Sequence, residues 1–296
     1  MLWPNRIFSA LFGLALLSAT PVETHAQEFE SPDILILGDS QISFGSGPAF
    51  LEFFTDIKKH SSPTPRQVTY INRLGKMNVG VIGVRSTSLH SWTARSGRAK
   101  DAVCEIDPKW KVNAGAYGFV NMTDNQFVQI GQGEEYQFCE PNMSPFEAMF
   151  RDDYYEPKLL LMSFLCNAAR RWANSKETAK SDVLNMVEQL PPDMPCIFMT
   201  TAPAFKKEIV DLRLKAQKNL MTAFEETGNR CTFVPGATPA TVAANQGNKE
   251  FFRLNKNGLV KDPFHPNQHA AKSFFALEMD NICHAIFEQI RNVMEE

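Results

Sequence analysis

The sequence lacks both a long apolar run and an excess of positive charge. No stretch of the 296 residues reaches the roughly 18–20 apolar residues that a membrane span requires, so no integral membrane segment is expected in the mature chain. Thirty Lys and Arg stand against 33 Asp and Glu, a formal net charge of −3. Because nonspecific nucleic-acid binding needs clustered positive charge, no nucleic-acid partner is expected. An aromatic content of 11% excludes disorder as the main state.

Several catalytic and metal-binding motifs are also missing. No two cysteines have C-x-x-C spacing, which disfavours a zinc ribbon or a thioredoxin-like site. There is no H-E-x-x-H, and Pro266 separates His265 from His269, so no metal site is predicted. The absence of G-x-S-x-G disfavours a standard α/β-hydrolase. We therefore expect neither a metal nor any other cofactor.

The first 26 residues have the pattern of a secretory signal. Arg6 precedes a short apolar run, Ile7 to Leu17, and small residues lead to Ala26. A membrane anchor or a core helix is the alternative, but the run is too short to span and Pro21 closes it. We predict cleavage after Ala26, a mature domain over 27–296, and a secreted or periplasmic location.

Export changes the interpretation of the six cysteines. An even number in an oxidising compartment suggests disulfides, although the sequence allows fifteen pairings. We favour Cys104–Cys139, because these residues bracket an irregular segment. Cys196 and Cys231 each open a predicted strand and are the second candidate pair. Two cysteines are then left free and buried, Cys166 and Cys283.

Short apolar runs alternate with helical patterns along most of the chain. Continuous apolar strands of this kind predict an α/β protein whose parallel sheet is covered on both faces. The insertion at about 86–157 breaks the alternation, and its residues 117–120 and 127–130 have the pattern of hairpins. The predicted strands of the sheet are 33–37, 78–82, 158–164, 196–200 and 231–234.

Polar residues and glycines follow these strands. Gly38-Asp39-Ser40-Gln41 follows the first strand, Gly83-Val84-Arg85-Ser86 the second, and Cys166-Asn167 the third. Asp262-Pro263-Phe264-His265-Pro266-Asn267 precedes a long final helix. Active sites of parallel sheets lie at the carboxyl ends of the strands. A hydroxyl, a backbone donor, an amide and an Asp/His pair are therefore expected at one rim, as acyl transfer requires.

These blocks resemble those of the SGNH/GDSL hydrolase superfamily. Gly38-Asp39-Ser40 near the mature amino terminus and Asp262-x-x-His265-Pro-Asn before the last helix carry the resemblance. It implies a three-layer α/β/α sandwich around a five-stranded parallel sheet, a flavodoxin-like arrangement. It also implies the hydrolysis of esters, often on lipids or carbohydrates.

Carried over by position, the resemblance makes Ser40 the nucleophile, His265 the general base and Asp262 the residue that orients the imidazole. The chemistry requires this set, because a serine hydroxyl is a weak nucleophile until an imidazole takes its proton. The oxyanion hole is assigned to the N–H groups of Ser40 and Gly83 and to the Asn167 side chain. The third block departs from the family's G-x-N-D, since only Asn167 matches.

The substrate is predicted from two residues beyond the second strand. Trp92 is the aromatic residue closest in sequence to Gly83 and is a candidate for stacking on a sugar, with core packing as the alternative. Arg85 is a candidate for an anionic substituent, with a structural ion pair as the alternative. We therefore expect an exported esterase that removes acyl groups, such as acetyl, from a carbohydrate or cell-envelope polysaccharide. The alternatives are a lipase or acyltransferase with the same site, and an inactive carbohydrate-binding protein.

Overall fold

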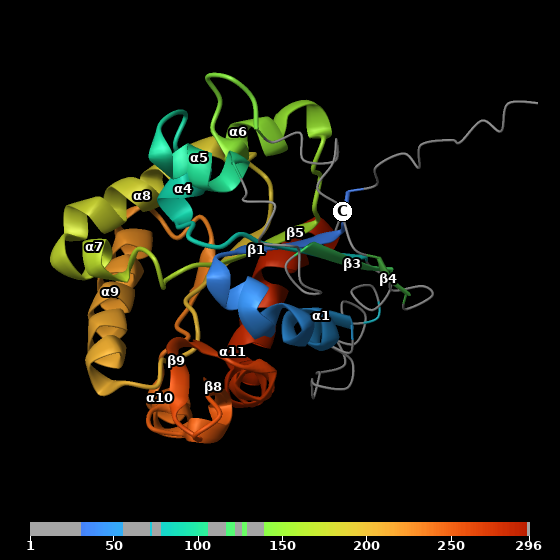
Figure 1. Ribbon diagram of the computed structural model, residues 1–296. Coiled ribbons are helices and arrows are strands. Elements are labelled where there is room, and N and C mark those ends of the chain that lie inside the picture. Colours follow the sequence, from blue (N-terminus) through green and yellow to red (C-terminus); the bar gives the residue numbers. More distant parts are fainter. Residues whose placement is uncertain are drawn as a thin grey trace, which may run out of the picture. The chain divides into compact units, whose positions relative to one another are not determined.

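The structure, a computed structural model, describes residues 31–55, 72, 78–105, 117–121, 126–128 and 139–294. The stretch from Ser31 to Glu296 forms one compact unit (Figure 1). The predicted signal segment, 1–26, lies outside the described residues.

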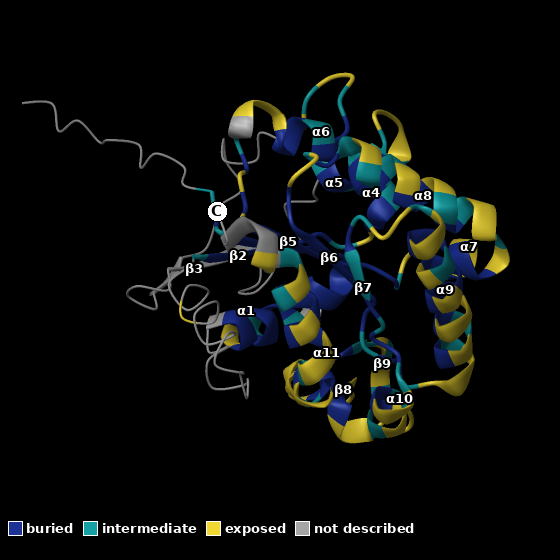
Figure 2. Ribbon diagram, turned by 180° about the vertical axis from the view of Figure 1, so that it is seen from behind, coloured by how far each residue is buried: buried dark blue, intermediate teal, exposed yellow. Residues whose placement is uncertain are grey.

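A seven-stranded sheet in the order β4-β3-β2-β1-β5-β6-β7 forms the centre of this unit. The five strands β2-β1-β5-β6-β7 are all parallel, which confirms the predicted five-stranded parallel sheet. Every residue of β1, β2, β5 and β6 is buried, as expected for apolar strands covered on both faces (Figure 2). The strand bounds are β1 Ile34–Gly38, β2 Val79–Gly83, β3 Tyr117–Asn121, β4 Gln126–Val128, β5 Leu159–Ser163, β6 Cys196–Met199 and β7 Thr232–Val234.

Helices cover both faces of the sheet. Figure 1 shows α1 and α11 on one face and α4 to α8 on the other, with α9 beside α7 and α8. Side chains of β6 alternate accordingly, since Ile197 packs in the core beneath α1 and α11 while Phe198 contacts Phe224 of α9. The α-helices are α1 Gly47–Thr55, α4 Leu89–Thr93, α5 Arg98–Cys104, α6 Pro145–Met149, α7 Ala169–Asn174, α8 Lys176–Gln189, α9 Lys207–Glu226, α10 Pro239–Asn245 and α11 Gln268–Met294.

The insertion after β2 contributes both strands and helices. Its predicted hairpin is present as β3 and β4, which pair antiparallel with each other. β3 also pairs antiparallel with β2, so the hairpin extends the central sheet rather than standing apart from it. A capping box starts α6, because Ser144 Oγ accepts from the N–H of Glu147 at 3.1 Å.

A small sheet that the sequence analysis did not predict precedes the last helix. Strands β8 (Phe252–Leu254) and β9 (Val260–Pro266) pair antiparallel, and β9 contains the D-x-x-H motif. The side chain of Asn267 then accepts from the N–H of Ala270 at 3.0 Å and starts α11. The three remaining short helices are the π-helix η1 Ile42–Ser46 and the 3-10 helices η2 Arg151–Asp153 and η3 Lys249–Phe251.

Four cysteines form the two pairs that the sequence favours. The sulfurs of Cys104 and Cys139 lie at bonding distance, and so do those of Cys196 and Cys231. The free Cys283 is buried, as expected, but the free Cys166 is only partly buried. Among the residues that the structure describes, no helix combines the length and apolar character that a membrane crossing needs.

Candidate active site

The turn that carries Ser40 is fixed by close packing and by Asp39. At Gly38, the last residue of β1, a Cβ atom would lie 2.5 Å from Cδ1 of Ile42 and 2.8 Å from the carbonyl oxygen of Ser163, so only glycine fits. Asp39 Oδ1 accepts from the N–H of Gln41 at 2.8 Å, and the carbonyl of Asp39 accepts from the N–H of Ile42 at 3.1 Å. The hydroxyl of Ser40 is therefore presented at the carboxyl end of the central strand.

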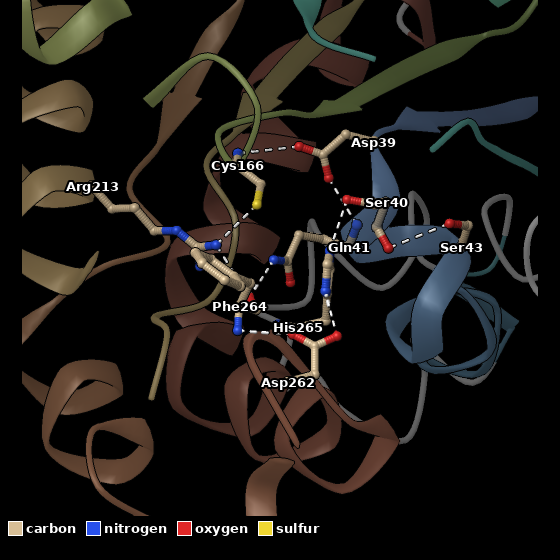
Figure 3. Close-up of polar contacts among 9 residues, drawn as sticks. All are labelled: Asp39, Ser40, Gln41, Ser43, Cys166, Arg213, Asp262, Phe264 and His265. Carbon is tan, nitrogen blue, oxygen red and sulfur yellow. Dashed lines mark hydrogen bonds and ion pairs between the residues drawn. The ribbon is translucent and has the colours of Figure 1, made fainter. Parts of the chain in front are cut away.

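Ser40, His265 and Asp262 form a continuous hydrogen-bonded chain (Figure 3). Nε2 of His265 lies 2.9 Å from Oγ of Ser40, and Nδ1 lies 2.8 Å from Oδ2 of Asp262. The other carboxylate oxygen accepts from the N–H groups of Phe264, at 3.0 Å, and His265, at 3.2 Å. β9 thus brings both residues of the D-x-x-H motif to the serine that follows β1.

The ionised carboxylate of Asp262 fixes the orientation of the imidazole, because it accepts a hydrogen bond from Nδ1. Burial by itself raises the pKa of Asp262, but the hydrogen bond and charge of His265 and the two backbone N–H groups outweigh it and hold this pKa below its usual value. The carboxylate therefore stays ionised at neutral pH and accepts a hydrogen bond from the N–H at Nδ1. The lone pair of Nε2 is then directed at the Ser40 hydroxyl, which is the arrangement of a general base.

A second carboxylate lies beneath the site and is fully buried. Oδ2 of Asp39 accepts from the backbone N–H groups of Cys166, at 3.1 Å, and Leu165, at 3.4 Å. Burial raises the pKa of Asp39, while the N–H donors and the charges of Arg213 and His265 oppose that rise. Asp39 therefore joins the serine turn to the loop that follows β5.

Asn167 lies in that loop and is exposed. Its Nδ2 donates one hydrogen bond, at 2.7 Å, to the carbonyl oxygen of Thr87. Since an amide nitrogen carries two hydrogens, this bond orients the group and leaves the second hydrogen for another acceptor. The structure thus joins the loops after β2 and β5 at the same rim of the sheet.

Gly83 does not fit its predicted role in the oxyanion hole. It is paired with Gly38 in the sheet, and the N–H of the next residue, Val84, donates to the Gly38 carbonyl at 3.0 Å. Because successive N–H groups of a strand point to opposite edges, the N–H of Gly83 is directed toward β3 and away from the serine turn. A Cβ at Gly83 would lie 2.8 Å from Cγ2 of Ile42, so this glycine is needed for close packing. The sequence prediction is wrong here, because sheet register decides where an N–H points.

Ser86, which the sequence analysis did not single out, has an unusual backbone. Its φ is 63°, a left-handed conformation that costs a non-glycine residue about 1 kcal/mol or more. It is exposed and precedes Thr87, whose carbonyl accepts from Asn167. Strained residues of this kind concentrate at functional sites. Nothing in the residue type signals this, because glycine is the usual residue at a positive φ.

The two predicted substrate contacts have different outcomes. Trp92 is 0% exposed, and its ring packs against Phe146 and Phe164 at centroid distances of 6.0 and 6.5 Å. A sugar cannot stack on a ring with no accessible face, so Trp92 is a packing residue and the predicted contact is wrong. Arg85 is partly exposed after β2, and burial lowers the pKa of its guanidinium.

The accessible aromatic residue at the site is Phe264, which the sequence analysis did not assign. It lies between Asp262 and His265 in sequence and is 45% exposed. Both of its backbone polar groups are bonded, since its N–H donates to Asp262 Oδ1 and its carbonyl accepts from Gln41 Nε2 at 2.7 Å. Its position inside the D-x-x-H motif is the signal that could have identified it. Among the described residues, no group of three His, Cys, Asp or Glu is arranged to hold a metal.

Comparisons with known proteins bring no family assignment. No family model matches the chain, and no curated protein does. Similar solved structures include a GDSL-like lipase from Bacteroides thetaiotaomicron, with 12% identity over 85% of this chain and 87% of that one and a TM-score of 0.36. An acetylxylan esterase from Geobacillus stearothermophilus is 14% identical over 88% and 95%, with a TM-score of 0.38. A family two carbohydrate esterase from Clostridium thermocellum, in complex with cellohexaose, is 12% identical over 90% and 66%, with a TM-score of 0.38.

Proposed function

We propose that the chain is an exported serine ester hydrolase that removes acyl groups, such as acetyl, from a carbohydrate. The hydrogen-bonded chain from Ser40 through His265 to Asp262 carries this proposal. Ser40 is 225 positions from His265 in sequence, yet the geometry of the three side chains is the one that nucleophilic ester hydrolysis requires.

In the proposed mechanism, Oγ of Ser40 attacks the ester carbonyl carbon while Nε2 of His265 takes the hydroxyl proton. The carbonyl oxygen becomes an oxyanion, which the N–H of Ser40 and the free amide hydrogen of Asn167 stabilise. The C–O bond then breaks, the alkoxide takes the proton from Nε2, and the acyl group remains on Ser40.

The second half of the reaction uses the same residues. Nε2 of His265 takes a proton from water, whose oxygen attacks the acyl-enzyme. The tetrahedral intermediate collapses, Oγ of Ser40 takes the proton back and the free acid leaves. Throughout, the carboxylate of Asp262 stabilises the transient imidazolium without being protonated itself.

The preference for a carbohydrate is proposed from the resemblance and from Phe264. A ring that is exposed beside the base, on a backbone held by hydrogen bonds to Gln41 and Asp262, offers a fixed apolar face to a sugar. Arg85 remains a candidate contact for an anionic substituent at the same rim.

The test is hydrolysis of p-nitrophenyl acetate and of an acetylated xylooligosaccharide by the chain 27–296. Ser40→Ala should reduce turnover by several orders of magnitude, because nucleophile and base act as a unit. Ser181→Ala, an exposed serine of α8, is the matched control and should keep full activity. Near-normal turnover by Ser40→Ala would overturn the proposal. Comparing acetyl with long-chain esters then separates a deacetylase from a lipase.

A further inference from the structure

We propose that Arg213 of α9 is a positioning residue. It holds strand β9, which carries His265, in place relative to the loop after β5, which carries Asn167. This inference rests on the proposed function for its catalytic consequence. Arg213 has no motif context and does not touch the triad itself. Its position in the structure nevertheless connects the segments that supply the base and the amide.

The guanidinium of Arg213 donates to acceptors in three segments, and Figure 3 shows two of them, Phe264 and Cys166. One terminal nitrogen donates to the carbonyl of Phe264 at 3.1 Å and to Sγ of Cys166 at 3.1 Å. The other donates to the carbonyl of Ala202, which follows β6, at 3.2 Å. Phe264 directly precedes His265, and Cys166 directly precedes Asn167. Each catalytic side chain is therefore one peptide unit away from an acceptor of the same guanidinium.

The free-energy cost of burying the charge of Arg213 indicates that its hydrogen bonds matter more than its packing. Arg213 is only 1% exposed, and within the described part of the chain no carboxylate lies within ion-pair distance of it. The charge of Arg213 opposes the rise that burial causes in the pKa of Asp39. Burying a charge without a contacting partner is costly, and an apolar side chain would pack there more cheaply. A planar fork of five N–H donors is, however, the one side chain that reaches three separate acceptors.

Cys166 contacts two buried polar side chains, Asp39 and Arg213. Asp39 Oδ2 accepts from its backbone N–H at 3.1 Å, and Arg213 donates to its sulfur. Cys166, the residue before Asn167, is thereby held through both its backbone N–H and its side chain. The carbonyl of Phe264 is likewise shared, because Gln41 donates to it from the serine turn while Arg213 donates to it from α9. Removing the guanidinium removes the hydrogen bonds to Cys166 Sγ and to the Phe264 carbonyl, while those made by Asp39 and Gln41 and the triad residues themselves remain.

The experiment compares Arg213→Met and Arg213→Lys with Asn219→Leu. Asn219 is the matched control, because it is also a buried polar residue of α9 and donates to one carbonyl, that of Trp172. For Arg213→Met we expect kcat on p-nitrophenyl acetate to fall about 10²-fold with KM almost unchanged, since small displacements of catalytic groups cost about this much. Lysine should restore part of the rate, and millimolar ethylguanidinium should restore part of it in Arg213→Met. Asn219→Leu should lower thermal stability without changing kcat in the folded protein.

A second measurement does not depend on turnover. The proton between His265 Nδ1 and Asp262 should give a downfield NMR resonance in the wild type and in Asn219→Leu, and this resonance should be lost or broadened in Arg213→Met. A double-mutant cycle with Gln41→Leu should be non-additive, because both residues donate to the Phe264 carbonyl. An unchanged resonance together with additive effects would overturn the proposal. Loss of the resonance in a protein that hydrolyses no ester would uphold the positioning role and refute the proposed function instead.

Discussion

The amide of Gln41 donates a 2.7 Å hydrogen bond to the carbonyl oxygen of Phe264, across 223 positions of sequence. The bond joins the residue that follows Ser40, the proposed nucleophile, to the residue that precedes His265, the proposed base. Ser40 and His265 are thus connected twice, once through their own side chains and once through these neighbours. The distance between Oγ and Nε2 is therefore set by backbone positions as well as by rotamers.

Replacing Asp262 with Asn should lower kcat by about 10⁴-fold while KM changes little. An amide can donate its N–H to Nδ1, which would place the imidazole proton on Nε2 and remove the base from Ser40. Stopped-flow assays on p-nitrophenyl acetate measure the loss. Asp211→Asn, an exposed α9 residue that pairs with Lys207, is the control and should be fully active. A loss of less than tenfold in Asp262→Asn would contradict the assigned role.

Phe264→Ala should weaken activity on an acetylated oligosaccharide more than on p-nitrophenyl acetate. The small ester needs the triad and the oxyanion donors, whereas the sugar also needs the exposed ring. Leu259→Ala removes a side chain that is 57% exposed in the β8–β9 turn and should affect neither substrate. Equal losses on both substrates would assign Phe264 to loop positioning and remove it from substrate recognition.

Trp92→Ala should instead reduce the free energy of unfolding by about 3–5 kcal/mol, because it empties a site filled by the largest side chain. Urea denaturation followed by circular dichroism provides the measurement. Any loss of activity in the folded fraction should be the same for the oligosaccharide and the small ester. A selective loss on the oligosaccharide, with stability unchanged, would show that the ring is accessible after all.

Gly83→Ala tests the packing role of that residue. The new methyl group would lie 2.8 Å from Ile42 Cγ2 and 2.9 Å from the nitrogen of Ser43, so η1 must shift. We expect a loss of about 1–3 kcal/mol in stability, typical of overpacking. Denaturant titration of the two proteins side by side gives the difference. Wild-type stability in Gly83→Ala would mean that the contact with Ile42 relaxes at no cost.

Cys166 should react slowly with iodoacetamide at pH 7. Burial raises the pKa of this thiol, chiefly by disfavouring the thiolate, and the nearby charge of Arg213 only partly opposes the rise. Because the thiolate is the reactive form, the alkylation rate should be below that of a free thiol and should increase as the pH rises above 9. Cys283, which is more buried than Cys166 and whose pKa is raised to about 11, should also react slowly. Mass spectrometry of timed samples decides this, and rapid labelling of Cys166 at pH 7 would contradict it.

The strands and the triad were accessible from the sequence because their signals are local. The apolar run 34–37 ends at Gly38, and the apolar run of β2 ends at Gly83. Both strands can therefore be predicted from a short stretch of sequence. Asp262 and His265 are three residues apart in one motif. Their approach to Ser40 was predicted from the family resemblance, because β9 belongs to the separate antiparallel pair and not to the parallel sheet.

The failures concern properties that only tertiary structure determines. Whether Trp92 faces solvent depends on Phe146, more than fifty positions later, which covers its ring. The direction of the Gly83 N–H depends on the register with β1, which no local pattern encodes. In the sequence Arg213 is an ordinary charged residue of an amphipathic helix. Its role cannot be predicted locally, because its three acceptors come from three other segments. Each of these properties is a relation between distant parts of the chain.

The two ends of β6 are restrained by different kinds of bond. At its amino end the disulfide from Cys196 to Cys231 ties β6 covalently to the segment that opens the edge strand β7. Beyond its carboxyl end, at the catalytic rim, Ala202 is held by a hydrogen bond from Arg213. A reductant therefore acts on the sheet at the end remote from the catalytic groups. The hydrogen bond between Arg213 and Ala202 is noncovalent and does not depend on the redox state, whereas the link between Cys196 and Cys231 does.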